Sequence, residues 1–528
     1  MRRKLKYAAA AAAGVLLLLW LFCLPHDLFE GTTYSTVVTD RNGALLGARV
    51  ADDGQWRFPP RDTLPEKFVK ALVEFEDRTF FDHCGVSPRA LVRAAIQNIR
   101  NGRIVSGGST LTMQVIRLSR QKPRTLWQKL VETCMATRLE LRCSKEEILR
   151  LYAAHAPFGG NVVGIDAARW RYLGSDRTEL SWAEAATLAV LQNAPSSIHL
   201  ARNRDQLLAK RNRLLARLHA KGEIDEEDYA LALEESLIGE PYPMPQYAPH
   251  LVEWYDRKAH GQRTVTHIDR DLQHRMEEVL VRWNRELRQK GIRDLAAIIV
   301  EVESGEPAAY CGNSDLSFDR DGKWVDIARS PRSSGSILKP LLYAAALERG
   351  TILPNSLLPD VPMDFGGFAP KNFNGSFAGA IEADQALALS LNIPNVYLLK
   401  EYGILRFVET LREAGLKTLS RPADEYGLSL ILGGAEVTLV EITACYAKMA
   451  ACYRDSTRYP SFPLHDRIAL YRTFEAMREV VRPDEMDWRR ASSAQNIAWK
   501  TGTSYGSRDA WAIGLTPKYV IGVWAGNA

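Results

Sequence analysis

The pattern of secondary-structure signals changes once along this chain, and that change limits the folds open to it. Residues 64–218 show helical periodicity almost throughout. Apolar runs at both ends of residues 291–528 are typical of strand hairpins, with helical segments between them. A sheet built from both ends of a segment must be closed by strands that are distant in sequence. We therefore predict a mainly α domain followed by an α+β domain.

A polar segment with several prolines, 219–262, separates the halves and predicts a domain boundary. The 528 residues are 46% hydrophobic and 25% charged, which suits two or three cored domains and excludes a disordered chain. The expected helices are 65–77, 87–99, 125–141, 145–155 and 181–192, and the expected strands are 296–302, 307–310, 510–514 and 519–524. The expected domains are 1–30 as a basic tail and anchor, 45–218, a linker at 219–290, and 291–528.

The N-terminus predicts a membrane anchor. A basic cluster within residues 2–6 precedes an uncharged run, 7–24, which would be about 27 Å long as a helix, close to the thickness of a bilayer core. The run ends without the small-residue pattern of a signal-peptide cleavage site, so we favour an uncleaved anchor over a signal peptide. Basic residues before the span should stay in the cytoplasm. We expect a single-pass membrane protein in which the chain after the span lies on the outer side.

Cysteine spacing and net charge exclude other classes. The seven cysteines show no CxxC spacing, so neither a zinc site nor a dense disulfide framework is indicated. The net charge of +5 is small for this length and gives no reason to expect a nucleic-acid partner.

An acid-free basic stretch marks the first candidate site. No Asp or Glu lies between His83 and Val131, although the stretch is rich in Arg and Lys, and Glu76 and Glu132 flank it. A carboxylate can deprotonate a hydroxyl, while cations stabilise a departing pyrophosphate. The pattern therefore favours transfer of a sugar from a phosphate carrier. A basic face that lies over anionic lipid is the alternative.

The same region resembles the peptidoglycan glycosyltransferases (family 51). Residues 76–85 (EDRTFFDHCG) and 107–114 (GGSTLTMQ) look like the first two motifs of that family. Residues 128–132 are similar to the third motif, and 145–152, with 158–160 and 172–174, to the fourth. The likeness covers about 64–200 and implies a lysozyme-like, mainly α domain. Two departures are Gln128 in place of the usual Arg, and 153–154 (AA) in place of Leu-Asn, which implies weaker pyrophosphate binding.

That resemblance assigns roles to single residues. Glu76 would be the general base on the 4-hydroxyl of the acceptor sugar. Lys129 and Glu132 would serve the donor pyrophosphate, where a divalent cation (Mg or Mn) bridging to Glu132 is physically reasonable. The other residues expected at the substrate cleft are Asp77, His83, Ser109, Thr110 and Gln114, of which His83 is expected to position or pack rather than carry a proton.

Ser336 and Lys339 form the second candidate site. Their spacing puts a hydroxyl and an amine on one face of a helix. Proline is tolerated only in the first helical turn, so Pro340 predicts that Ser336 lies at or just before the helix start, where free N–H groups face it. Ser336 could then be a nucleophile, and Lys339 its base if burial or neighbouring cations keep the amine neutral.

S-x-x-K at 336–339 is followed by 390–392 (SLN) and 500–502 (KTG), an order that resembles the penicillin-binding proteins and class A β-lactamases. The likeness runs from about 264 to 524, and with the first half it resembles a class A penicillin-binding protein, most of all the 1C branch. It implies a serine transpeptidase domain with a β-lactamase-like fold. Ser336 would attack a D-Ala-D-Ala stem peptide and Lys339 would take its proton. The residues expected to complete the site are Ser390 and Asn392 for proton transfer and orientation, Lys500, Thr501, Gly502 and Thr503 for the substrate carboxylate, and the N–H groups of Ser336 and Thr503 for the oxyanion.

Together the likenesses imply a bifunctional enzyme that polymerises lipid II and cross-links stem peptides. Its expected partners are lipid II, the growing glycan strand, D-Ala-D-Ala stem peptides, β-lactams, the membrane and other cell-wall synthesis proteins. A glycosyltransferase with a silent acyl-transfer domain, and a non-catalytic scaffold or β-lactam sensor, stay open as alternatives. The first half disfavours a plain β-lactamase.

The chain end gives a further expectation. The family continues beyond its last hairpin with a helix against the sheet, whereas this sequence stops at Ala528, so residues 291–528 are expected to be a C-terminally truncated domain. Val520, Ile521 and Trp524 are then expected to be exposed unless another segment covers them.

Overall fold

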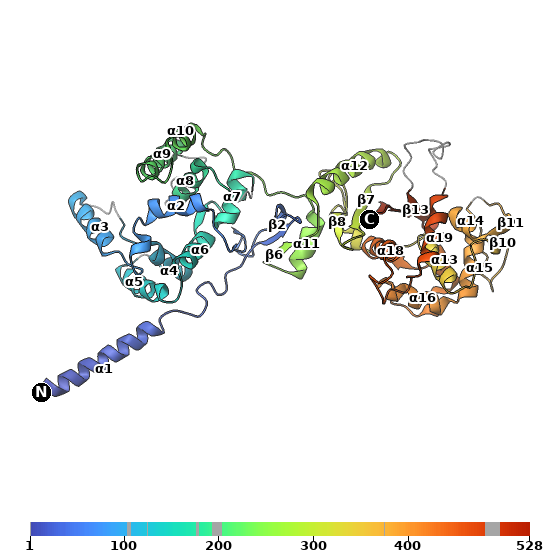
Figure 1. Cartoon of the computed structure of the whole chain (residues 1–528), viewed down its shortest axis with the longest axis horizontal. Helices are drawn as coiled ribbons and strands as arrows, with labels where there is room; N and C mark the ends of the chain where they lie inside the picture. Colours follow the sequence, from blue (N-terminus) through green and yellow to red (C-terminus); the bar gives the residue numbers. More distant parts are fainter. Residues whose placement is uncertain are drawn as a thin grey trace. The chain divides into compact units, whose positions relative to one another are not determined.

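The computed structural model describes residues 2–102, 107–123, 125–175, 179–192, 203–373, 375–480 and 497–527. The chain divides into two compact units (Figure 1). The first comprises residues 1–39, 44–246 and 255–264, and the second comprises 40–43, 247–254 and 265–528. Each unit has its own core and is described by itself.

The first unit is built mainly of helices. They are α1 (Arg2–Leu21), α2 (Glu66–Glu76), α3 (Pro88–Asn101), α4 (Leu111–Arg120), α5 (Leu126–Glu140), α6 (Lys145–His155), α7 (Ile165–Leu173), α8 (Trp182–Leu191), α9 (Arg204–Ala220) and α10 (Glu226–Glu234). Small strands accompany them: β1 (Thr36–Thr39), β2 (Leu45–Arg49), β3 (Trp56–Arg57), β4 (Pro157–Gly159) and β5 (Val162–Val163). The five helices expected from periodicity are confirmed to within two residues at each end.

Local capping explains where several of these helices begin. Ser144 and Ser181 each accept from the backbone N–H three residues later, and a glutamate at that position bonds back to the serine N–H. Such capping boxes satisfy backbone donors that the first helical turn leaves free. Ser87 caps α3 in a similar way, with Pro88 in the first turn.

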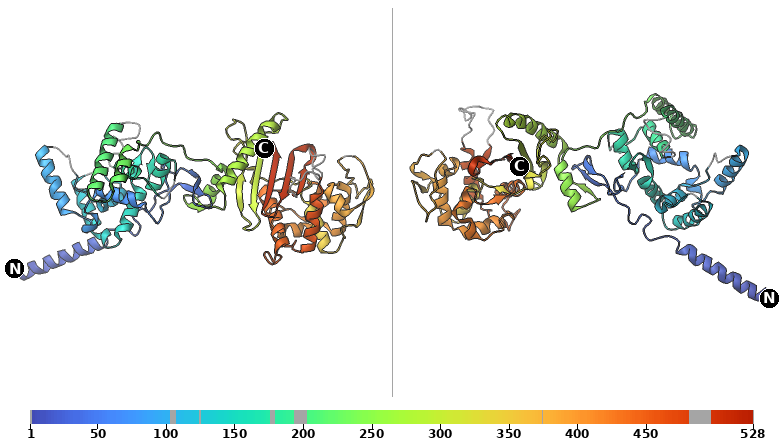
Figure 2. Two further views of the ribbon diagram at one scale, coloured as in Figure 1. Left: turned by 45° about the horizontal axis from the view of Figure 1, so that its top comes forward. Right: turned by 180° about the vertical axis from the view of Figure 1, so that it is seen from behind.

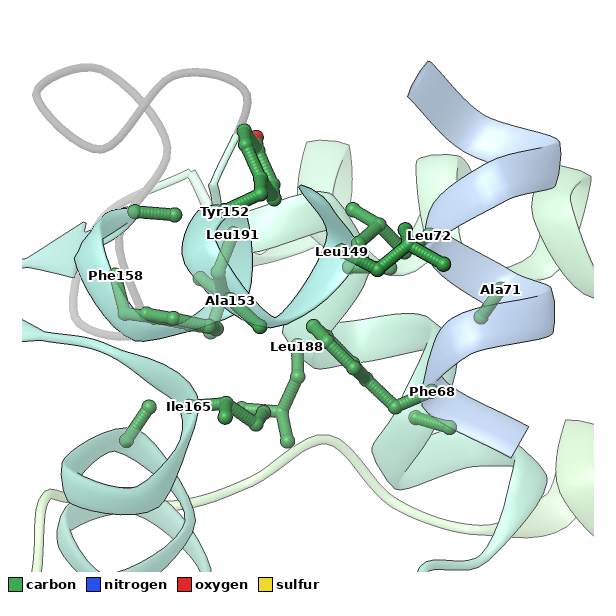
Figure 3. Close-up of a cluster of buried hydrophobic side chains, with 14 of the residues drawn as sticks. Phe68, Ala71, Leu72, Leu149, Tyr152, Ala153, Phe158, Ile165, Leu188 and Leu191 are labelled. Atoms are coloured by element: carbon green, nitrogen blue, oxygen red, sulfur yellow. The ribbon is translucent and has the colours of Figure 1, made fainter. Parts of the chain in front are cut away.

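The core of the first unit lies around α8. Every residue of α8 except Glu184 is buried, as expected of a helix that is apolar on nearly all sides. Figure 3 shows Phe68 and Leu72 of α2 and Leu149 of α6 pointing into the same cluster as Leu188 of α8. This packing fixes α2 and α6, which carry residues of the first candidate site.

No helix in the described part of the chain, α1 included, combines the length and apolar character needed to cross a membrane.

The second unit is organised around a five-stranded antiparallel sheet in the order β13-β14-β15-β7-β8 (Figure 2). The strands are β7 (Asp294–Glu301), β8 (Pro307–Cys311), β13 (Ala498–Thr503), β14 (Asp509–Leu515) and β15 (Tyr519–Gly526). The first and last hairpins join where β15 pairs with β7, for example Gly522 with Ile298. The expected closure of one sheet by distant segments is therefore confirmed.

Other helices and short strands lie outside this sheet. The helices are α11 (Pro249–Lys258), α12 (Arg270–Arg288), α13 (Lys339–Glu348), α14 (Ala383–Ala388), α15 (Asn392–Tyr402), α16 (Ile404–Glu413), α17 (Ala423–Tyr426), α18 (Leu439–Arg454) and α19 (Arg467–Arg478). The short strands are β6 (Arg263–Val265), β9 (Arg332–Ser333), β10 (Leu357–Asp360), β11 (Gly379–Glu382) and β12 (Glu436–Val437). The helix α11 and the strand β6 each have residues in both units.

The segment expected to be a linker, 219–290, holds α10, α11, β6 and α12. Met276 and Leu280 of α12 pack with Leu295, Ala297 and Ile299 of β7. The many charged residues of α12 occupy its other face, so average polarity concealed an apolar stripe that covers one side of the sheet.

The helix α18 covers the opposite side of the sheet. A Cβ on Gly522 would lie 2.0 Å from Thr443 Oγ1, which shows how closely α18 approaches β15. Val520 and Trp524 are fully buried, so α18 is the covering segment without which they were expected to be exposed. Ile521 points to the other face because side chains alternate along a strand, and it is 38% exposed.

Candidate active sites

Glu76 ends α2 and is held by a glutamine from α4. Gln114 donates through Nε2 to Glu76 Oε2 at 2.8 Å, and its Oε1 accepts from the Tyr152 hydroxyl at 3.5 Å. Burial, with the negative charge of Glu76, raises the pKa of Tyr152 well above its usual range. Tyr152 therefore stays a donor, which fixes the orientation of the Gln114 amide. Glu76 itself is only half-buried, so its carboxylate can reach a substrate hydroxyl.

Asp77 and His83 join the end of α2 to the start of α4. Asp77 Oδ2 accepts from His83 Nε2 and from the Leu111 N–H, both at 3.0 Å. The Gly85 N–H donates to His83 Nδ1 at 3.1 Å, so the ring proton lies on Nε2 and points at Asp77. Both side chains thus have hydrogen-bond partners within the protein. This agrees with a positioning role for His83 and gives Asp77 the same role.

Thr110 is buried and caps α4. Its hydroxyl accepts from the Met113 N–H at 3.2 Å and donates to the Gly85 carbonyl at 2.6 Å. The resemblance implied a substrate contact, but this hydroxyl is already satisfied inside the unit. Ser109, one residue earlier, is half-buried and lies outside the helix.

Lys145 and Glu140 form a supporting ion pair beneath the His83 loop. Lys145 Nζ donates to the His83 carbonyl at 2.7 Å and lies 2.8 Å from Glu140 Oε2. Thr112 donates to the other carboxylate oxygen at 2.6 Å. Such a buried pair needs these additional hydrogen bonds to offset its desolvation. Sequence reasoning placed Lys145 in the fourth motif but gave Glu140 no role, because the link between them forms only in the fold.

Arg117 of α4 lies beside Glu132, the second carboxylate of this site. Arg117 Nε lies 3.4 Å from Glu132 Oε2 on α5, and Glu132 is 8% exposed. Gln114 and Arg117 are three residues apart and so share one side of α4. One side of this helix thus holds both Glu76 and Glu132. Lys129 is half-buried on α5, one turn before Glu132.

Some basic residues of the stretch between His83 and Val131 lie at this site and others lie on the surface. Arg117 faces Glu132, whereas the arginines of α3 are exposed. On α3 they accompany Val92, Ile96 and Ile99, which are also exposed. The exposed arginines of this helix are Arg89, Arg93 and Arg100. The alternative of a lipid-facing basic surface therefore stays open for α3, whereas Arg117 is paired with Glu132.

In the second unit, Lys339 is the first residue of α13 and is fully buried. Pro340 lies in the first turn, so Ser336 precedes the helix as expected. Lys339 Nζ donates to the Ser390 carbonyl at 2.8 Å, the Leu391 carbonyl at 3.1 Å and Asn392 Oδ1 at 2.8 Å. These acceptors favour the ammonium form. Burial, and then the positive charge of Lys500, act more strongly and lower the pKa of Lys339 well below its usual range.

Lys500 is the second buried amine of this site. Its Nζ donates to Ser390 Oγ at 2.7 Å and to the Thr501 carbonyl at 2.6 Å. Burial lowers the pKa of Lys500 to about 7. The amine can therefore gain and lose a proton near neutral pH, as a group that passes protons must.

Two glycines allow β13 to approach the nucleophile segment. Gly335 has a positive φ of 51°, and a Cβ there would lie 2.8 Å from the Thr503 backbone nitrogen. A Cβ on Gly502 would lie 2.8 Å from Ile337 Cγ2. The Thr503 N–H is thus held beside the segment that carries Ser336, as an oxyanion hole requires.

Two hydrogen bonds from other elements also fix the segment that carries Ser336. Tyr446 of α18 donates to the Ile337 carbonyl at 2.7 Å, and Trp511 Nε1 of β14 donates to the Ser333 carbonyl at 2.8 Å. Segments distant in sequence therefore set the position of Ser336. Sequence reasoning gave neither residue a role, because both are far from Ser333 and Ile337 in the sequence.

A cavity of about 850 Å³ opens over these groups. Among its lining residues are the expected Ser336, Ser390, Asn392, Thr501, Gly502 and Thr503. Two aromatic side chains at its rim, Phe373 and Tyr505, are 98% and 96% exposed. Exposed rings at a cavity rim are typical of a binding surface, and sequence reasoning did not single them out.

In the described part of the chain, no group of three or more His, Cys, Asp or Glu side chains is arranged to hold a metal ion.

Two family models match this chain. The model described as Transglycosylase matches residues 43–219, and the Penicillin binding protein transpeptidase domain matches residues 295–525. They cover the unit with Glu76 and the unit with Ser336, in that order.

Known proteins resemble nearly the whole chain. Penicillin-binding protein 1C of Escherichia coli is 39% identical over 93% of this chain and 64% of its own length. Penicillin-binding protein 1B of Vibrio cholerae is 29% identical over 92% of this chain and 67% of its own length. The chain thus spans less than two thirds of the 1C relative.

The fold is also shared with a solved structure. The crystal structure of penicillin-binding protein 1A from Haemophilus influenzae matches with a TM-score of 0.50 at 18% identity, over 94% of this chain and 88% of that one. With both domains matched in order and the 1C relative at 39% identity, this chain belongs to the class A penicillin-binding proteins.

Proposed function

We propose that this chain is a bifunctional peptidoglycan synthase, which polymerises lipid II and cross-links the stem peptides of the product. The observation that carries the first activity is the shared side of α4, where Gln114 orients Glu76 and Arg117 lies at Glu132. The second activity rests on Ser390, which links two buried lysines beside Ser336.

In the glycosyltransferase unit, Glu76 acts as the general base. It removes the proton of the acceptor 4-hydroxyl as that oxygen attacks the anomeric carbon of the donor. The bond from that carbon to the pyrophosphate oxygen breaks, and the lipid pyrophosphate leaves with the electron pair. Arg117 and Lys129 stabilise the growing negative charge.

A divalent cation is a further proposal for the donor side. Mg²⁺ commonly binds through one or two carboxylates together with substrate phosphates, so Glu132 fits this type of site without a protein cage. Mg²⁺ or Mn²⁺ held there would add positive charge at the leaving pyrophosphate. Polymerisation assayed with and without chelator tests the requirement.

In the transpeptidase unit, Ser336 attacks the carbonyl of the D-Ala-D-Ala amide while Lys339, as a neutral amine, takes its proton. The N–H groups of Ser336 and Thr503 bind the oxyanion. The C–N bond then breaks, and the leaving D-Ala receives a proton through Ser390, whose hydroxyl is bonded to Lys500. The amine of a second stem peptide attacks the acyl-enzyme and releases Ser336.

Substrate binding involves β13 and the cavity rim. Lys500, Thr501 and Thr503 hold the terminal carboxylate, and one N–H of Asn392 Nδ2 orients the substrate amide. β-Lactams, which mimic the D-Ala-D-Ala amide, acylate Ser336 and are released slowly.

We further propose that the chain is anchored in the bacterial plasma membrane, with both domains on the periplasmic or extracellular side. The support is the basic cluster and the uncharged run at 7–24. Recovery of the full chain in a membrane fraction that resists high salt and is dissolved by detergent supports the anchor. Release by high salt alone contradicts it.

One experiment tests both activities. The full chain in detergent is given lipid-linked precursor, and glycan chains are measured beside covalent labelling by a fluorescent penicillin. Glu76→Gln should lower polymerisation about a hundredfold or more and leave labelling intact. If the folded parent chain makes no polymer, the result favours a non-catalytic scaffold. If it makes polymer but is not labelled, the result favours a glycosyltransferase with a silent transpeptidase domain.

A further inference from the structure

The loop between β10 and β11 forms one wall of the cavity over Ser336. Phe368, Pro370, Lys371 and Phe373 of this loop line the cavity. The two strands are antiparallel neighbours and pair Asp360 with Gly379 at the base of the loop. The position of this wall therefore depends on what holds the loop above its base.

Asn372 is buried within this loop, only 4% exposed. Its Nδ2 donates to Asp360 Oδ1 at 2.7 Å and to the Ser376 carbonyl at 2.9 Å. Its Oδ1 accepts from the N–H groups of Asn392 and Ile393, at 2.9 and 3.4 Å. One side chain thus connects the loop to its base and to the first turn of α15.

Asp360 determines which way the Asn372 amide points. Its side chain is buried, and its second oxygen accepts from the Ala378 N–H at 2.8 Å. A carboxylate only accepts hydrogen bonds, so the NH₂ group of Asn372 must face Asp360 and its oxygen must face α15. Burying a carboxylate costs free energy unless hydrogen bonds satisfy it. Here the bonds that satisfy Asp360 also fix the orientation of the Asn372 amide.

The orientation of the Asn372 amide in turn fixes Asn392, one of the residues expected in the site. The Asn392 N–H donates to Asn372, and its Nδ2 donates to the carbonyl of the neighbouring Lys371 at 2.8 Å. Its Oδ1 consequently faces Lys339 Nζ at 2.8 Å. Two adjacent loop residues thus hold both the backbone and the side chain of Asn392.

We propose that Asp360 and Asn372 are positioning residues for acyl transfer, which orient Asn392 toward Lys339 and hold the cavity wall against it. The inference rests on the proposed transpeptidase function. Neither residue contacts the substrate in this arrangement, because both are buried behind Asn392.

The first test compares Asn372→Ala with the parent chain. Labelling of Ser336 is followed at several concentrations of fluorescent penicillin, which separates the limiting acylation rate from the half-saturating concentration. We expect the limiting rate to fall about tenfold to a hundredfold, as for a misplaced catalytic group, with little change in half-saturation. An unchanged limiting rate would overturn the proposal.

Asn313→Ala is the matched control. Asn313 donates through Nδ2 to Asp294 Oδ1 at 3.0 Å, and both residues are buried. The variant thus removes a buried Asn–Asp hydrogen bond in the same unit, between residues that do not line the cavity. It should lower the melting temperature and keep the acylation rate of the parent. An equal loss of rate in this control would mean that Asn372 acts through stability alone.

An exchange of the pair tests the orientation directly. Asp360→Asn leaves a single acceptor oxygen for the two donors, Asn372 Nδ2 and the Ala378 N–H. Asn372→Asp places two carboxylates together. Each single variant therefore disrupts one of the hydrogen bonds that fix this orientation. The double variant restores one donor and one acceptor and keeps an acceptor toward α15, although it loses the bond to Ser376. Recovery of the acylation rate above both single variants supports the proposal. A double variant as slow as the slower single one would refute it. A parent chain that is not labelled would instead refute the transpeptidase function itself.

Discussion

Lys500 donates a hydrogen bond to the hydroxyl of Ser390, with 2.7 Å between Nζ and Oγ. The backbone oxygen of the same serine accepts from Lys339 at 2.8 Å. Ser390 holds a left-handed φ of 54°, an unfavourable conformation for a residue with a side chain. The surrounding structure therefore keeps Ser390 between the two amines at an energetic cost, as is typical of functional sites.

Ser390→Ala should lower the rate of Ser336 labelling about a hundredfold, because the path from Lys500 to the leaving group is lost. Time courses with fluorescent penicillin measure this rate. Ser304→Ala, in the exposed turn between β7 and β8, is the control and should label at the parent rate. If Ser390→Ala also labels at the parent rate, Ser390 is not part of the path that carries the proton.

The pKa of Lys500 predicts a pH-dependent stability. Burial lowers that pKa from 10.5 to about 7, so between these values the unfolded chain binds more protons than the folded chain. The free energy of unfolding should then rise with pH across this window, by up to ~1.4 kcal/mol per pH unit from this lysine. In Lys500→Met this contribution is absent. Unfolding of both proteins at pH 7, 8 and 9 measures the difference, which should grow with pH; a constant difference would contradict the lowered pKa.

Gln114→Glu places a second carboxylate where Nε2 now donates to Glu76. Like charges at this distance disfavour the charged form of a carboxyl group. The acid limb of the pH profile of polymerisation should move to higher pH, and penicillin labelling should be unchanged. Gln114→Leu, which removes the donated hydrogen bond without adding charge, should slow polymerisation and move the acid limb less than Gln114→Glu does. An identical pH profile for parent and Gln114→Glu would argue against Glu76 as the base.

Gly335→Ala should abolish penicillin labelling while polymerisation continues. The added Cβ would meet the Thr503 backbone at 2.8 Å and push β13 away from Ser336. Gly350→Ala is the matched control, because Gly350 also has a positive φ, 72°, but its Cβ would meet nothing within 4 Å. The two variants share the backbone strain and differ in the clash. Equal labelling by both would show that the close approach of β13 is not required.

Part of the secondary structure could be predicted from the sequence. The helices around α8 and the two hairpins of the sheet follow from local periodicity, because a helix or strand needs an apolar pattern of its own period. The region 219–290 could not be predicted in this way. The charged face of α12 dominates its composition, and only packing against β7 shows which residues form its apolar side.

The sequence by itself determined which residues are the candidates for the chemistry. Glu76, Ser336, Lys339 and Lys500 stand in motifs whose spacing is local, and Pro340 alone placed Ser336 ahead of a helix. Only the tertiary structure decided how these groups are held. The contacts of Gln114 with Glu76, Lys500 with Ser390, and Asp360 with Asn372 join separate elements. The burial of Trp524 under α18 likewise depends on a helix far from it in sequence. Hydrogen bonds and burial between distant segments depend on three-dimensional distance, which local patterns of residues do not encode.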